Sequence, residues 1–170
     1  MARGPYRSDP AGVLHVIEVA RRPLPAVGDG VRVDLGRLYL SGEGLFFVSG
    51  WQLHREDAVD GLIGALLVAD IGAIVRAARR SADPVTEAAG RRHLDELRGL
   101  SPEQQVANSA DSLHVPIDDI ADATIGRLLG PLRVVTRARG EVHTFELDRR
   151  DRGAARTWIA GLPGPGSALR

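Results

Sequence analysis

The side chains of this chain that are best suited to chemistry are its histidines, and their spacing does not favour a metal site. They are His15, His54, His93, His114 and His143. No two of them stand in a His-x-x-x-His or His-Glu-x-x-His arrangement. His114 and His143 alternate with apolar neighbours, so we expect both to lie in strands and to face solvent. The alternative is that the two rings meet across a sheet and bind a metal ion. We adopt the first interpretation and predict no metal ligand.

A group of carboxylates follows His54 and is the next candidate for chemistry. Glu56, Asp57 and Asp60 lie within a few residues of one another, and such a cluster could serve as a general acid and base. Acidic residues are also favoured at the beginning of a helix, and this second interpretation is the more common one. Asp118 and Asp119 are similarly typical of a turn or of the start of a strand.

The sequence contains no motif for a catalytic nucleophile or for phosphate binding. Gly42-Glu43-Gly44 begins like a dinucleotide loop, but it has no third glycine and no helix follows it, so it predicts a hairpin turn. There is no Gly-x-Ser-x-Gly elbow and no P-loop. We therefore expect a protein that is not an enzyme and that carries no catalytic residue and no cofactor.

Composition excludes further classes of function. The chain has no cysteine, which excludes disulfides and thiolate chemistry and fits a reducing compartment. Its 22 basic residues balance 22 acidic ones, so the positive charge of a general nucleic-acid binder is missing and we expect no nucleic-acid partner. The N-terminus lacks the apolar core of a signal peptide. We expect a cytoplasmic protein, with peripheral attachment at the inner face of the membrane as the alternative.

The elements that position these residues fall into two β halves around a helical block. Residues 12–20 are apolar enough for a strand or a short helix, and prolines and glycines at 23–30 predict a connection. Alternation over 31–50 predicts a hairpin that turns at 41–44. From residue 57 to 108 the period becomes helical. Asp83-Pro84 marks the start of one helix, Gly99 can end it, and Ser101 with Gln104 forms a capping box for another.

The β pattern resumes at residue 112 and leads to an amphipathic helix. Strands are expected over 112–117 and 119–127, and a hairpin over 132–147 turns at Gly140. Residues 148–162 form an arginine-rich helix with Ala155, Trp158, Ile159 and Leu162 on one face. Burial of a tryptophan contributes on the order of 5 kcal/mol at most, so we expect Trp158 to be critical for the fold.

Two stretches give these elements a family resemblance. GRLYLSGEGLFFVS (36–49) resembles a hairpin of GRAM and other pleckstrin-homology-like (PH-like) domains, and 114–147 resembles the second half of that fold. The resemblance implies an α+β protein: a small antiparallel PH-like β-barrel with a helical insertion and a capping C-terminal helix. It also implies a module that binds lipid headgroups, peptides or itself. Arg32 and Arg37 lie near the matching hairpin, but they lack the paired spacing of a phosphoinositide-binding loop.

The domain boundaries follow from this resemblance. Residues 1–27 are expected to form an N-terminal segment, and 164–170 a disordered tail. Residues 28–163 are expected to be a single PH-like domain, in which 28–56 and 111–163 form the barrel and 57–110 form the insertion.

The least polar stretch of the chain, 61–80, predicts a helix with one bulky and one small-residue face. Residues 61–75 would span about 22 Å, against about 30 Å of membrane hydrocarbon, so the helix should not cross a bilayer. Asp70 lies on the bulky ridge, either at its edge in contact with water or buried in an ion pair with an arginine that fixes how the insertion docks. The candidate interaction surface consists of Leu62, Leu66, Asp70, Arg76, Arg79 and Arg80.

We therefore expect a binding or assembly module. Its partner would be another protein or a second copy of the chain, which would make it a homo-oligomer. The alternative is a peripheral membrane module in which the insertion helix and its arginines meet anionic lipid.

Overall fold

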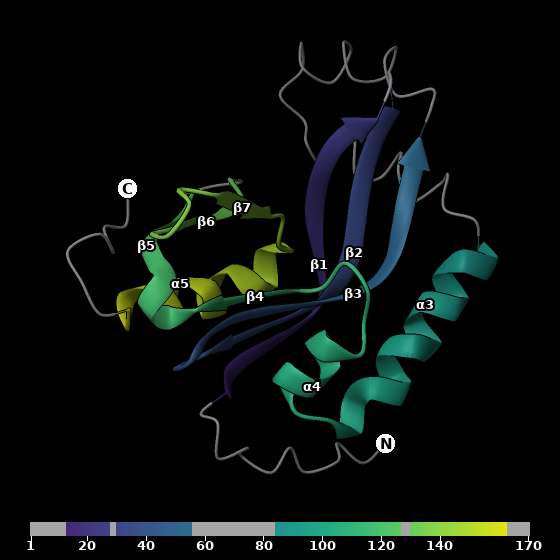
Figure 1. Cartoon of the computed structure of the whole chain (residues 1–170), viewed down its shortest axis with the longest axis horizontal. Helices are drawn as coiled ribbons and strands as arrows, with labels where there is room; N and C mark the ends of the chain where they lie inside the picture. Colours follow the sequence, from purple (N-terminus) through teal and green to yellow (C-terminus); the bar gives the residue numbers. More distant parts are fainter. Residues whose placement is uncertain (1–12, 28–29, 56–83, 127–129, 163–170) are drawn as a thin grey trace.

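The computed structural model describes residues 13–27, 30–55, 84–126 and 130–162, and shows an α+β protein built on two antiparallel sheets (Figure 1). The four-stranded sheet has the order β1-β2-β3-β4, and the three-stranded sheet has the order β5-β6-β7. The first sheet contains β1 (Val13–Val27), β2 (Gly30–Ser41), β3 (Gly44–Arg55) and β4 (Leu113–Pro116). The second contains β5 (Ile120–Ile125), β6 (Leu132–Thr136) and β7 (Val142–Phe145). The helices are α3 (Pro84–Glu96), α4 (Pro102–Ala107) and α5 (Arg152–Ala160).

The N-terminal part of the described chain corrects two expectations. Strand β1 runs without a break through Pro23 and Pro25, where the sequence predicted a connection, and it pairs with β2 from Val13 to Val27. Proline lacks an N–H donor but is tolerated on an edge strand, and β1 is an edge of its sheet. Residues 13–27 are therefore part of the sheet, and the expected boundary at residue 28 is wrong.

The predicted β2–β3 hairpin is confirmed. The Ser41 hydroxyl accepts hydrogen bonds from the backbone N–H groups of Glu43 (3.1 Å) and Gly44 (3.2 Å), which fixes the turn. Gly44 has a φ of 145°, a conformation that favours glycine. Strand β4 pairs with β3 only between Gly44 and Phe47. Beyond that point β1, β2 and β3 continue as a three-stranded extension (Arg22–Val27, Gly30–Asp34 and Trp51–Arg55) that rises past the second sheet (Figure 1).

The described part of the insertion is helical, as predicted. Helix α3 begins at Pro84, and a short 3-10 helix ends at Gly99. In α4 the Ser101 side chain accepts a hydrogen bond from the backbone of Gln104, and the Gln104 side chain accepts one from the backbone of Ser101. This reciprocal pair is the predicted capping box.

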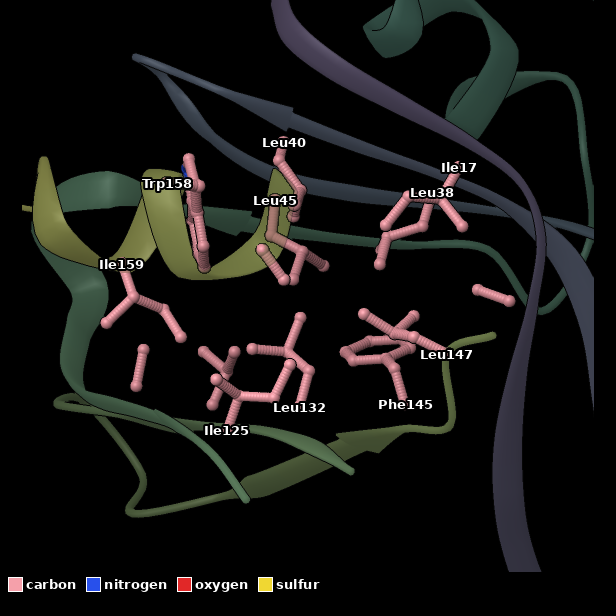
Figure 2. Close-up of a cluster of buried hydrophobic side chains, with 14 of the residues drawn as sticks. Ile17, Leu38, Leu40, Leu45, Ile125, Leu132, Phe145, Leu147, Trp158 and Ile159 are labelled. Carbon is pink, nitrogen blue, oxygen red and sulfur yellow. The ribbon is translucent and has the colours of Figure 1, made fainter. Parts of the chain in front are cut away.

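The main core lies between the two sheets and is closed by α5 (Figure 2). Trp158 is fully buried there, beside Leu40, Leu45 and Ile159. Its indole N–H donates a 2.9 Å hydrogen bond to the Ser41 carbonyl. The helix predicted over 148–162 is observed as α5, preceded by one 3-10 turn, and it buries Ala155, Trp158 and Ile159 of the predicted face. Leu162 lies beyond the end of α5 and is partly buried against the same core.

A second apolar cluster lies on the opposite face of β2 and β3, beneath α3. It contains Leu35, Tyr39, Phe46, Val48, Trp51, Leu94 and Leu97. Strands β2 and β3 therefore bury side chains on both faces, which explains why Leu45–Val48 is an unbroken apolar run.

The expected closed barrel is not found. Across the described ranges the strands form two separate sheets, and an isolated bridge between Arg21 and Glu146 links β1 to the segment after β7. The α+β class and the antiparallel strands of the prediction are confirmed. The β6–β7 hairpin is also as predicted, with Gly140 at a φ of 64° in its turn.

Candidate functional site

A polar cluster surrounds Asp34, where the three-stranded extension begins. Asp34 is fully buried. Its Oδ2 accepts a 2.7 Å hydrogen bond from Nη2 of Arg22, and its Oδ1 accepts a 2.6 Å bond from the Ser49 hydroxyl. Arg22 and Asp34 are cross-strand partners on β1 and β2, which places their side chains on one face. Three neighbouring strands thus contribute one group each.

The same cluster holds the segment 109–112, which connects α4 to β4. Nη2 of Arg22 also donates to the Asp111 carbonyl at 2.5 Å, and the Gln52 amide donates to the Asp111 carboxylate at 3.0 Å. Asp111 has a φ of 59°, which non-glycine residues adopt infrequently. The side-chain hydrogen bonds to Asp111 support this conformation.

Electrostatics at Asp34 reflect its burial. Burial raises the pKa of the Asp34 carboxyl, while the hydrogen bond from Ser49 and the charge and hydrogen bond of Arg22 act against that rise. The nearby Asp111 carboxylate adds to the rise. The guanidinium of Arg22 also lies 4.8 Å from the centre of the Phe47 ring, which adds a cation–π contact to the ion pair. The arrangement orders backbone segments around a carboxylate that can take up a proton.

Arg37 forms a second buried polar group, on the face beneath α3. Its Nε donates to Glu18 at 2.9 Å, and its Nη1 donates to the Leu94 carbonyl at 3.0 Å. Tyr39 beside it donates to the Gln105 side chain at 2.8 Å. These contacts fasten α3 and α4 to the sheet, so Arg37 is engaged inside the fold rather than presented to a ligand.

Arg32, the other arginine that the family resemblance singled out, lies on β2 next to the Asp34 cluster. Its Nη2 donates to the Gln52 side chain at 2.8 Å. Arg32 and Arg37 therefore point to different faces of β2 and are not brought together.

The two strand histidines lie in different sheets. His114 is on β4 and stacks on Phe46, with ring centres 4.1 Å apart. His143 is on β7, with Nε2 3.7 Å from a Glu141 carboxylate oxygen. Burial lowers the pKa of both imidazoles. They do not pair across a sheet, and no group of three potential metal ligands occurs within the ranges that the structure describes.

Several candidates lie outside the described residues. These are the interaction-surface residues Leu62, Leu66, Asp70, Arg76, Arg79 and Arg80, and the carboxylates Glu56, Asp57 and Asp60. Asp118 and Asp119 are described, and they form the predicted turn, a 3-10 helix between β4 and β5.

Sequence reasoning missed the Asp34 cluster. Asp34 alternates with Val33 and Leu35, a pattern that predicts a polar, solvated face. The structure covers that face with a segment 75 or more residues further along the chain. The signal that was available is weak: an acid on β2 and an arginine on a neighbouring strand.

Comparisons of the chain with protein-family models, with curated proteins and with solved structures give no match. Among the helices that the structure describes, none is long and apolar enough to cross a membrane.

Proposed function

We propose that this protein is a non-catalytic, cytoplasmic binding or assembly module that acts through protein–protein contact, foremost with a second copy of itself. We further infer a PH-like arrangement: four strands, then three strands, then a closing helix with a buried tryptophan support it. Two arginines of the described part, the partly buried Arg22 and the buried Arg37, support a structural rather than a catalytic role, because each holds separate elements together.

The observation that carries the proposal is where the apolar stretch 61–75 attaches. Strand β3 ends at Arg55, paired with Val31 at the far end of the extension, and α3 begins at Pro84. The least polar part of the chain therefore lies, in sequence, between the end of β3 and the start of α3. A contiguous apolar surface is typical of a protein–protein contact, and this stretch supplies the apolar side chains that such a surface needs.

Light scattering after gel filtration tests self-association. We expect the mass measured for the full chain to exceed the monomer mass of 18.2 kDa. The oligomeric fraction should rise with protein concentration. A Leu62→Ser, Leu66→Ser double variant should be monomeric, because it removes apolar contact area. Val85→Ser is the matched control, since Val85 is 71% exposed on α3 and lies outside the proposed surface. A wild-type chain that stays monomeric at every concentration refutes self-association.

The alternative is a peripheral membrane module, which is favoured by Arg76, Arg79 and Arg80 at the end of the apolar stretch. Basic residues near an anionic bilayer contribute about 1 kcal/mol each. Co-sedimentation with phosphatidylserine-containing vesicles, compared with neutral vesicles at low and high salt, separates the two proposals. Binding that requires anionic lipid, weakens with salt and is lost in the triple Arg→Gln variant supports the membrane alternative.

A further inference from the structure

The Asp34 cluster joins parts of the chain that are far apart in sequence, and it holds the segment 109–112 against the strands. The segment 109–112 is the only covalent link between the helical layer of α3 and α4 and strand β4 within the described chain. It touches the strands through side-chain hydrogen bonds. The Ser109 hydroxyl donates to the Ser49 carbonyl at 2.7 Å, and the Ser49 N–H donates to the Ser112 hydroxyl at 2.9 Å.

Two of the groups that hold this segment are also hydrogen-bonded to Asp34. Arg22 reaches the Asp111 carbonyl with the same nitrogen, Nη2, that donates to Asp34. Ser49, which exchanges two hydrogen bonds with the segment, is held by its hydroxyl on the other Asp34 oxygen. Hydrogen bonds to an ionised carboxylate are about twice as strong as neutral ones.

We propose that Asp34 and Arg22 form a proton-sensitive latch that holds the segment 109–112 on the sheet, and that protonation of Asp34 releases this segment while the rest of the fold persists. The proton comes from solvent and adds to the carboxylate, so Arg22 loses its anionic partner. Asp111, with its infrequently adopted backbone conformation, then loses part of its support.

The surroundings of Asp34 define the direction of the response. The charged groups that act on it are Arg22 on β1 and Asp111 in the held segment. Arg32, two residues earlier on β2, is engaged with Gln52. His143 on β7 lies close enough to Arg22 for the two charges to interact. Burial, the largest effect, raises the pKa of Asp34, so the latch should open at a milder pH than that at which exposed aspartates titrate.

Nuclear magnetic resonance of the full chain tests the latch without any substitution. The carboxyl carbon of Asp34 should titrate at a higher pH than is usual for an aspartate. Over the same interval, the protection of the Ser49 amide against hydrogen exchange, corrected for intrinsic rates, should fall about tenfold or more. Core amides such as that of Val134 should keep their protection.

Asp34→Asn provides the matched perturbation, because it keeps an acceptor oxygen and mimics the protonated side chain. It should show the low protection of Ser49 already at pH 7, with little further pH dependence. Asp122→Asn, at a half-buried carboxylate of β5, should behave as the wild type.

Three results would overturn the proposal. The first is wild-type protection of Ser49 that stays constant while Asp34 titrates. The second is an Asp34→Asn variant with wild-type protection at pH 7. The third is global unfolding at a pH above the titration of Asp34, because the released but folded state would then not exist.

Discussion

Removal of the Trp158 side chain is the most direct perturbation of the main core. In the Trp158→Ala variant a fully buried ring between α5 and the two sheets disappears, and the Ser41 carbonyl loses the indole donor. Large-to-small core substitutions of this kind cost about 3 to 5 kcal/mol, and a buried carbonyl without a partner adds about 1 to 3 kcal/mol. The sum is about 4 to 8 kcal/mol, which is comparable with the whole stability of a typical domain, about 5 to 15 kcal/mol.

Urea unfolding followed by circular dichroism measures this loss. Trp51 remains as a fluorescent reporter in the second cluster, so the two probes together show whether both clusters unfold in one transition. We expect the Trp158→Ala variant to unfold at much lower urea or to be largely unfolded in its absence.

Trp158→Phe keeps the prediction informative if the alanine variant does not fold. It retains most of the ring and loses the hydrogen bond, so we expect a loss of about 1 to 3 kcal/mol, or roughly 2 to 12 °C in Tm for a chain of this size. Val85→Ala on the exposed face of α3 is the control and should stay within about 0.5 kcal/mol of the wild type. If both tryptophan variants match that control, α5 does not close the core.

Four further substitutions test individual turns, contacts and charges. Gly44→Ala should prevent or severely weaken folding, because the φ of Gly44 is 145° and an added Cβ would collide with a carbonyl of β4. Gly140→Ala is the milder counterpart, because no atom lies near the added Cβ. It should lower the free energy of unfolding, measured in a thermal melt, by only about 1 to 2 kcal/mol. Arg37→Met should cost about 1 to 3 kcal/mol in urea unfolding, because the Leu94 carbonyl loses its donor; an unchanged midpoint would contradict a role in holding α3. Burial lowers the pKa of His114 in the folded protein. As the pH drops, His114 of the unfolded chain is therefore protonated at a higher pH than His114 of the folded chain. The free energy of unfolding should consequently fall as the pH drops below about 6.5. His114→Gln should flatten that dependence, and identical pH profiles for the two proteins would refute the assignment.

The local elements of this fold could be predicted because short-range rules specify them. The capping box at Ser101 and the start of α3 at Pro84 depend on residues within one turn of the helix. The β2–β3 hairpin and the buried face of α5 follow from the periodicity of apolar residues. The site was less predictable, because the carboxylate of Asp34 meets groups from β1, β3 and the 109–112 segment only in the folded chain.

The sequence by itself determined where the described helices and hairpins form, and that Trp158 lies on an apolar helix face. Tertiary structure decided that β1 continues through two prolines. Proline has no N–H group to donate to a neighbouring strand, and β1 tolerates this because it lies at the edge of its sheet. Tertiary structure also decided that the strands form two sheets rather than a closed barrel, and that Asp34 and Arg37 are buried. The periodicity of apolar residues indicates which residues share a face of a strand. What later covers that face depends on segments far away in the chain, and here both faces of β2 are covered.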